Sequence, residues 1–260
     1  MTTRTTESPS AAVERALGIL EHVAISTSGL TNSELSRRLE IPKSSASYIL
    51  RTLERRGYLA RDAESGKYRL GLKVLALGRG VRTGMDLRKV ALPFLQQLVD
   101  RTQLTCHLAI LDAGEAVYIE KVEAPGFIKM DTWIGRRMFV HSTSVGKSLV
   151  AWLPAAEIES IIREHGLPKR TAKTITVGAK LVKELEKVRA QGFAVDDEEN
   201  SPGARCVGVP VFDAPAHAPA AIGLSGTTGQ VTHENLPKLA ESLKETARKV
   251  SRQLGFVAMR

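Results

Sequence analysis

The segment from Leu30 to Gly71 constrains the fold of this 260-residue chain more than any other part. It reads LTNSELSRRLEIPKSSASYILRTLERRGYLARDAESGKYRLG. Thr31 is followed three residues later by Glu34, a spacing typical of a helix start at which the two side chains cap backbone N–H groups reciprocally. A first helix is therefore predicted from about Asn32 to about Leu39. Ile41-Pro42 then forms a short turn that opens a second helix.

The second helix has two different faces. Ala46, Ile49, Leu50 and Leu53 follow the spacing i, i+3, i+4 and i+7, which predicts one apolar stripe. The other side carries basic and hydroxyl-bearing groups that can reach phosphates and base edges in a DNA major groove. These DNA-binding candidates are Lys43, Ser44, Ser45, Ser47, Tyr48 and Arg51. Serine can bond either a phosphate or a base, so the operator sequence cannot be read from this helix.

A β-hairpin is expected after Gly57, which ends the second helix. Its strands, 58–61 and 67–70, flank the turn-rich segment 62–66. Its basic residues Arg61, Lys67 and Arg69 would flank the duplex. Cap, turn, stripe, basic face and hairpin together predict a winged helix-turn-helix whose partner is double-stranded DNA. Two alternatives are a helical domain with merely solvated charges and a winged helix that docks protein, which would show no salt-sensitive DNA affinity.

Composition agrees with a polyanionic partner. The formal net charge is +9, and residues 1–80 hold 13 Lys and Arg against 8 Asp and Glu, so over half of the excess lies in under a third of the chain. Two cysteines without a CxxC pattern argue against a disulfide scaffold or a structural zinc site. No apolar run approaches the ~20 residues that span a membrane, and the start MTTRTTESPS lacks the apolar core of a signal peptide. We expect a cytoplasmic protein with a mobile tail over residues 1–9.

Helix-capping residues and glycines elsewhere in the chain predict the domain organisation. Ser10 can cap a helix carrying Val13, Leu17, Leu20 and Val23, which completes a winged domain over residues 10–71. A short apolar helix over 72–77 is followed by Gly78, Gly80 and Gly84, which favour a flexible or kinked linker ending near residue 85.

Residues 86–260 are expected to form a second domain. Strands are predicted over 105–111, 116–122, 193–196, 207–212 and 220–224, with a further apolar segment over 127–134. Helices are predicted over 86–102, 144–152, 154–165, 177–191 and 233–254. Strands in pairs, with helices between and after them, predict an α+β domain on a mostly antiparallel sheet.

Gly146-Lys147-Ser148 mimics the end of a phosphate-binding P-loop. That motif requires glycine five residues before Gly146, where this chain has His141, so nucleotide hydrolysis is excluded. What remains is a helix start near Ser144, whose free N–H groups and positive dipole end can take a carboxylate. An ordinary capped helix packed on the sheet is the alternative.

Several segments resemble the IclR family of bacterial transcriptional regulators, over nearly the whole chain from about Ala12 to Gly255. They are VERALGILE, IPKSSASYILRTLERRGYL, YRLG, HSTSVGKSLVA and DDEENSPGARCVGVPVFD. The last is the most specific, with Asp197, Glu198, Glu199, Gly203, Cys206, Pro210 and Asp213 in the family's pattern. The resemblance implies a GAF-like effector domain, a small-molecule effector that is most often a carboxylate or aromatic acid, and a homodimer or homotetramer on operator DNA. No cofactor and no metal are expected.

The resemblance also implies an effector site. The carboxylate would be held at Ser144 and Val145, and the remainder of the pocket lined by Asp196, Cys206, Ser225, Phe127 and Met130. Gly223 and Ala204 stand where some relatives have a hydroxyl and a larger aliphatic residue, which predicts a roomier pocket with fewer hydrogen bonds. An aromatic acid is therefore favoured over a two- or three-carbon keto acid. The alternatives are a cysteine that belongs to the core and an acidic run that is solvated.

An enzyme would use Cys206 as nucleophile and His141 or His107 as base. Such a nucleophile needs a base oriented by a third group, and no local pattern shows one, so we expect no enzyme. We expect instead that the effector shifts the population of dimer or tetramer arrangements. The spacing of paired recognition helices, and with it operator affinity, would then change.

Overall fold

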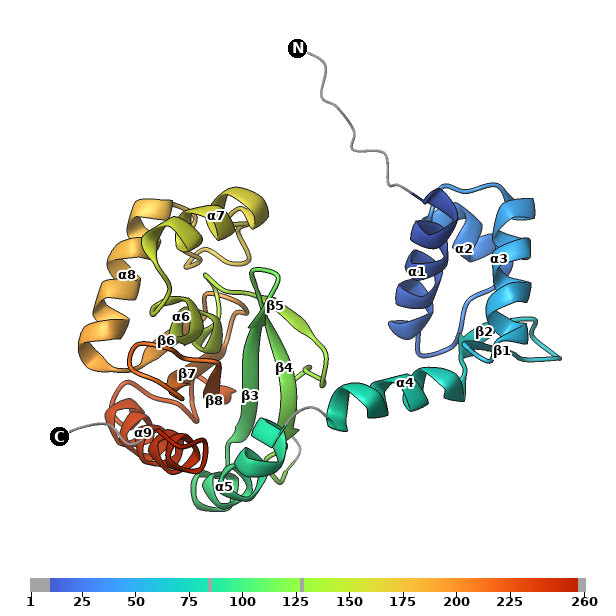
Figure 1. Cartoon of the computed structure of the whole chain (residues 1–260). Coiled ribbons are helices and arrows are strands. Elements are labelled where there is room, and N and C mark those ends of the chain that lie inside the picture. Colours follow the sequence, from blue (N-terminus) through green and yellow to red (C-terminus); the bar gives the residue numbers. More distant parts are fainter. Residues whose placement is uncertain (1–9, 84–85, 127–128, 257–260) are drawn as a thin grey trace, which may run out of the picture. The chain divides into compact units, whose positions relative to one another are not determined.

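The computed structural model describes residues 10–83, 86–126 and 129–256. The expected mobile tail over residues 1–9 and the expected pocket residue Phe127 lie outside them. The chain divides into two compact units, residues 1–85 and residues 86–260 (Figure 1).

The first unit is the predicted helix-turn-helix with a hairpin. Its helices are α1 (Ala11–Ala24), α2 (Asn32–Arg38), α3 (Lys43–Arg55) and α4 (Leu72–Thr83). The hairpin pairs β1 (Leu59–Arg61) with β2 (Tyr68–Leu70) in antiparallel register. One apolar core joins α1, α2, α3 and the hairpin.

The predicted cap of α2 is confirmed. The Thr31 hydroxyl accepts the Glu34 N–H at 3.3 Å, and the Glu34 carboxylate accepts the Thr31 N–H at 2.7 Å. These two bonds satisfy backbone donors that the first helical turn leaves without partners. The backbone N–H and the hydroxyl of Thr31, which both donate to the Glu34 carboxylate, lower the pKa of Glu34.

Two expectations for this unit are wrong. The Ser10 side chain makes no capping bond, and Val13 and Leu17 of α1 are 56% and 51% exposed. The other two expected residues, Leu20 and Val23, do belong to the core, together with Ala16 and Ile19. Ala16, Ile19, Leu20 and Val23 also follow helical spacing, so the sequence of α1 contains two overlapping apolar stripes. The rotation of α1 about its own axis determines which stripe is buried.

The linker differs from its prediction as well. Helix α4 continues through Gly78 and Gly80 to Thr83, whereas the sequence predicted a helix that stops at Leu77. A glycine inside a helix costs about 1 kcal/mol relative to alanine, which lowers helix propensity without forbidding the helix.

The second unit contains a six-stranded antiparallel sheet in the order β5-β4-β3-β8-β7-β6. Its strands are β3 (Thr105–Asp112), β4 (Glu115–Val122), β5 (Arg137–Phe139), β6 (Ala194–Asp197), β7 (Ala204–Val211) and β8 (Ala220–Thr227). The predicted α+β class is confirmed. The expected apolar segment over 127–134 forms no strand among its described residues, and pairing with β4 begins only at Arg137.

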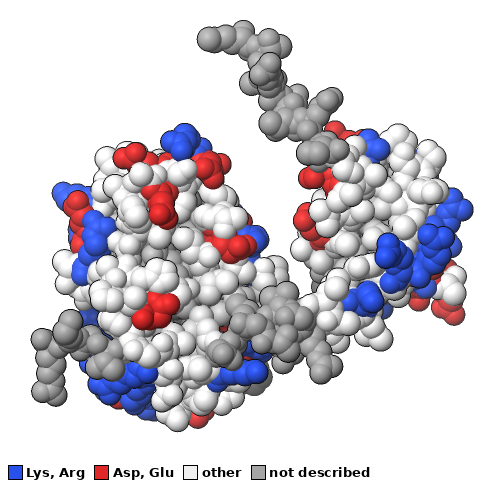
Figure 2. All heavy atoms as spheres, viewed as in Figure 1, with Lys and Arg blue, Asp and Glu red and all other residues white. Residues whose placement is uncertain are grey.

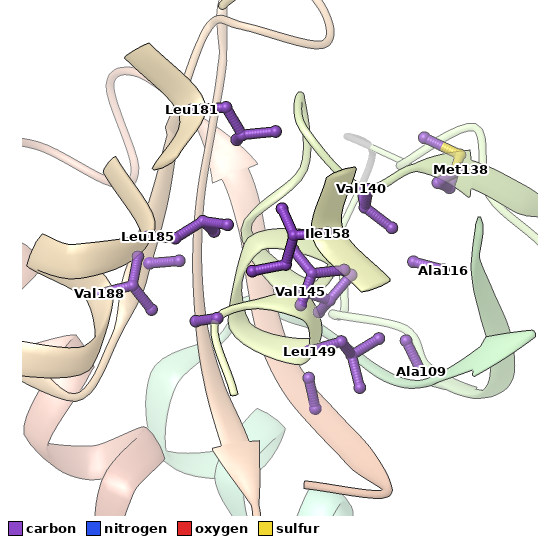
Figure 3. Packing of buried hydrophobic residues seen from close by; sticks show 14 of the residues in the cluster. Ala109, Ala116, Met138, Val140, Val145, Leu149, Ile158, Leu181, Leu185 and Val188 are labelled. Atoms are coloured by element: carbon purple, nitrogen blue, oxygen red, sulfur yellow. The ribbon is translucent and has the colours of Figure 1, made fainter. Parts of the chain in front are cut away.

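Helices cover both faces of this sheet (Figure 1). Helices α5 (Asp86–Thr102) and α9 (Leu236–Gln253) pack on one face and against each other. Helix α6 (Ser144–Val150) lies on the other face, and α8 (Gly178–Gln191) packs against α6. Side chains of α6, α7 (Ala155–His165), α8 and the sheet form one apolar cluster (Figure 3).

Candidate functional site

The predicted DNA-binding residues lie on α3 and the hairpin of the first unit. Buried Ala46, Leu50 and Leu53 anchor α3 in the core. The opposite face carries Lys43, Ser44, Tyr48 and Arg51 exposed, with Ser45 and Ser47 half-buried. Tyr48 is 71% exposed, which is unusual for a large aromatic side chain. This face is therefore free to meet a partner.

The hairpin continues this surface. Arg61 and Arg69 are exposed and Lys67 is half-buried. Figure 2 shows Lys and Arg side chains gathered over the part of this unit where α3 meets the hairpin. The turn is held by Asp62, whose carboxylate accepts the N–H and the hydroxyl of Ser65 at 2.8 and 2.6 Å. Both bonds lower the pKa of Asp62.

Sequence reasoning missed one basic residue next to this surface. Arg15 of α1 lines a shallow groove of about 370 Å³ together with Ser44, Ser45 and Tyr48 of α3. Nothing in the local sequence around Arg15 distinguishes it from an ordinary solvated residue.

The second unit contains a cavity of about 180 Å³ between the sheet, the start of α6 and three loops. Among the expected effector residues, Ser144, Val145, Asp196, Cys206, Ser225, Met130 and Ala204 line it. The lining also includes His107, Tyr118, Asp131, Thr132, Arg136, Met138, Thr143, Arg170, Asn200 and Ser201. The sequence offered no signal for most of these, because they come from loops or from strand positions without a motif.

Strand register brings three of the expected residues together. Asp196 of β6 pairs with Cys206 of β7, which pairs with Ser225 of β8. Residues directly opposite in an antiparallel sheet share a face, so these three form one polar row across three strands. Val145 and Ser144 face this sheet from the start of α6, which presses against β7 at Gly208. A Cβ there would lie 2.7 Å from the Ser144 carbonyl carbon.

Gly223 does not line the cavity, and the extra room expected from it is filled. A Cβ built on Gly223 would meet Val145 Cγ1 at 2.6 Å. The bulk of Val145 and the absence of a side chain at Gly223 therefore compensate for each other. Hydroxyl, imidazole, amide and guanidinium groups also line the cavity.

Burial governs the protonation of the polar row. Asp196 is 3% exposed, and desolvation raises its pKa to about 7, although its Oδ1 accepts the N–H groups of Glu199 and Asn200 at 2.8 and 3.2 Å. Burial, with Asp196 nearby, raises the pKa of Cys206 to about 12. Cys206 is thus a thiol rather than a thiolate, which opposes a nucleophilic role.

His107 supplies a neutral imidazole to the same cavity. Burial and the cations Lys121 and Arg136 lower its pKa to about 3. Its Nε2 lies 2.7 Å from the Thr132 hydroxyl and its Nδ1 lies 3.4 Å from the Ser225 hydroxyl. Its ring stacks on Tyr118 with centroids 4.5 Å apart.

Lys147 of the GKS sequence does not line the cavity. It is fully buried, and its ammonium group donates to the carbonyl of Val195 and, at 2.6 Å, to the carboxylate of Glu199. Glu184 lies 3.7 Å away. The lysine therefore ties α6 to the segment after β6, which explains why a phosphate-loop sequence is present without a phosphate site.

Two further observations concern the described residues as a whole. Among residues 10–83, 86–126 and 129–256, no cluster of His, Cys, Asp and Glu could hold a metal ion. In the same ranges, every helix is too short or too polar to cross a membrane.

Comparison with known proteins decides the family. The model for the bacterial transcriptional regulator IclR C-terminal domain matches residues 80–252, and that for the IclR helix-turn-helix domain matches residues 12–63. The chain belongs to the IclR family of bacterial transcriptional regulators. The first unit thus carries the family's helix-turn-helix and the second its C-terminal effector domain.

Relatives of this IclR-family regulator are similar over most of their length. It is 38% identical over 246 residues to the regulator XynR of Escherichia coli, covering 95% of this chain and 98% of XynR. It is 36% identical to KdgR of the same species, over 86% of this chain and 85% of KdgR. The Thermotoga maritima IclR structure matches with a TM-score of 0.77 at 34% identity, covering 94% of this chain and 98% of that structure. These relatives are regulators rather than enzymes, and the enzyme interpretation of Cys206 is rejected.

Proposed function

We propose that this regulator binds operator DNA through α3 and the hairpin and that a small organic acid in the cavity of the second unit changes its DNA affinity. The observation that carries the proposal is the cavity itself. Buried polar groups from β3, β6, β7 and β8 converge on a space of about 180 Å³ in the effector domain. A few polar groups that converge on an enclosed space are typical of a selective small-molecule site.

The size of the cavity supports a one-ring effector. An engineered protein cavity of about 150 Å³ holds benzene, so a space of this size accepts one aromatic ring or a short aliphatic acid. One solved structure of the same fold is an IclR homologue from Microbacterium hydrocarbonoxydans complexed with 4-hydroxybenzoate, at 23% identity and a TM-score of 0.81. That likeness concerns the fold alone. For this chain, an aromatic acid is our proposal.

The acid group is proposed to approach the backbone N–H groups of Ser144 and Val145, which have no partner within their helix turn. Asp196, Cys206 and Ser225 would bond the remainder of the effector. Arg136 and Arg170 also line the cavity and favour an anion over a neutral compound.

Coupling between the two units is proposed to run through the oligomer. We assign residues 10–71 to DNA binding, 72–85 to the linker helix and 86–260 to effector binding, in a cytoplasmic homodimer or homotetramer. Effector binding would shift the population of oligomer arrangements and so the spacing of paired α3 helices.

The division of labour is tested with Arg51→Ala and Lys43→Ala, with Lys180→Ala as a matched control on α8 of the second unit. Each α3 variant is expected to weaken DNA binding at least tenfold and to lower the salt slope of DNA binding by about 1, because one phosphate contact is lost. Acid binding should be unchanged, because the cavity lies in the other unit. Loss of DNA and acid binding together would contradict the proposal. DNA affinity without any salt dependence would favour a winged helix that docks protein.

A further inference from the structure

We infer that Arg170 is a specificity-determining residue that bonds the acid group of the effector. The inference rests on the proposed function, since it assumes that the cavity binds an organic acid. Arg170 lies in the segment between α7 and α8 and lines the cavity beside Asn200 and Ser201. It matches none of the family motifs found in the sequence.

The charges of the cavity make Arg170 distinctive. Four charged residues line it: Asp131, Arg136, Arg170 and Asp196. Arg136 is already engaged, with Asp131 at 3.5 Å and the Trp133 ring centroid at 4.6 Å. Within the described ranges, no carboxylate forms an ion pair with Arg170. Arg170, an exposed residue, therefore lines the cavity without an ion-pair partner in those ranges.

The backbone of Arg170 is fixed rather than loose. The Thr174 hydroxyl accepts the N–H groups of Arg170 and Thr171 at 3.0 and 2.8 Å. The same hydroxyl lies 2.6 Å from the carbonyl of Glu199, and the Thr171 hydroxyl donates to the carbonyl of Glu198 at 2.7 Å. Threonine hydroxyls thus clamp the segment that carries Arg170 onto the chain after β6.

The same group of hydrogen bonds extends to Asp196, which lines the cavity. Glu199 N–H, next to the carbonyls that the threonines contact, donates to Asp196 at 2.8 Å. These hydrogen bonds therefore connect the segment that carries Arg170 to the loop that follows Asp196. An effector lying on the polar row of Asp196, Cys206 and Ser225 would occupy a cavity that Arg170 also lines.

The chemistry of the two candidate anion anchors differs. Helix α6 has seven residues, so its start offers partial charges from a short run of amides. A guanidinium offers a full charge and paired N–H donors that match a carboxylate, which makes it selective for the ionised acid over the neutral amide of the same shape. Arg170 therefore determines that the effector is an anion.

The test compares the full-length protein with Arg170→Gln, Arg170→Lys and Lys169→Gln. Lys169 is exposed, as Arg170 is, but does not line the cavity, so it controls for the loss of one positive charge. Binding is titrated with benzoate, 4-hydroxybenzoate and pyruvate and with the amide of each acid. Binding of the amides serves as the check that each variant is folded.

We expect Arg170→Gln to weaken binding of the acid at least tenfold, because a charged hydrogen bond changes affinity by roughly tenfold to a hundredfold. The affinity for the corresponding amide should be unchanged. Arg170→Lys should recover part of the loss, and Lys169→Gln should bind like the wild type. If the wild type binds an acid and Arg170→Gln binds it equally well, this inference is wrong and the proposed function stands. If the wild type binds none of the acids, the proposed function fails and the inference with it.

Discussion

Asp196→Asn should change how the stability of the second unit depends on pH. The carboxyl is 3% exposed, and burial raises its pKa from 3.8 to about 7. An asparagine keeps the oxygen that accepts the N–H groups of Glu199 and Asn200 and removes the titrating charge. The variant therefore isolates the free energy of burying this carboxylate.

The direction and size of this change in stability follow from the linkage between proton binding and folding. Because the folded pKa lies above the unfolded pKa, the unfolded state releases its proton first, and the wild type loses stability as pH rises from about 4 to about 7. With 1.36 kcal/mol for each pKa unit, the loss approaches about 4 kcal/mol above pH 7. The stability of Asp196→Asn relative to the wild type should rise by this amount over the same window.

The assay is urea unfolding at pH 4.5, 6.0 and 7.5, followed by tryptophan fluorescence. Both tryptophans, Trp133 and Trp152, belong to the second unit, so the signal reports that unit alone. A difference between variant and wild type that stays constant across these pH values would refute the reasoning, because the carboxyl would then titrate alike in both states.

Asp197→Asn is the matched control. Hydrogen bonding and charge from Arg205 outweigh desolvation and lower the pKa of Asp197, so its contribution to stability is present above its ordinary pKa of 3.8 and is lost only in stronger acid. The difference between Asp197→Asn and the wild type should stay nearly flat from pH 4.5 to 7.5. A slope like that of Asp196→Asn would show that a general charge effect is being measured.

Two further predictions concern packing and capping. Gly223→Ala should cost about 1–3 kcal/mol by crowding Val145 Cγ1, and Val145→Ala should relieve the loss, measured by the same fluorescence unfolding; equal destabilisation in both backgrounds would contradict this contact. Thr31→Ala should cost about 1 kcal/mol and speed amide hydrogen exchange within α2, because the capping box is lost; unchanged exchange in α2 would show that the cap contributes nothing.

The first unit could be predicted because its elements depend on short sequence patterns. The Thr31 and Glu34 pair, the proline-opened α3 and the hairpin turn each depend on residues a few positions apart, and all of them are present. The face of α1 was misjudged because two stripes share helical spacing in that sequence. Which stripe is buried depends on how α1 meets α2 and α3, which no local pattern encodes.

The cavity depends on contacts between distant segments. The row of Asp196, Cys206 and Ser225 exists because β6, β7 and β8 pair in one register, and the sequence pointed to it only through a family resemblance. Arg170 and His107 lie far from these residues in the chain and carry no periodic signal. The compensation between Val145 and Gly223 could not be predicted either, because the two residues are 78 positions apart and meet only where α6 packs on β8.

The central claim is that an acid bound in the second unit changes DNA binding by the first. The direct measurement is a fluorescence titration of the protein against DNA from upstream of its own gene, at two salt concentrations, with and without aromatic and keto acids. We predict salt-sensitive binding that one acid changes by about 5- to 150-fold, with the DNA changing affinity for that acid by the same factor. Salt-sensitive DNA binding that an acid bound in the cavity leaves unchanged would contradict the account.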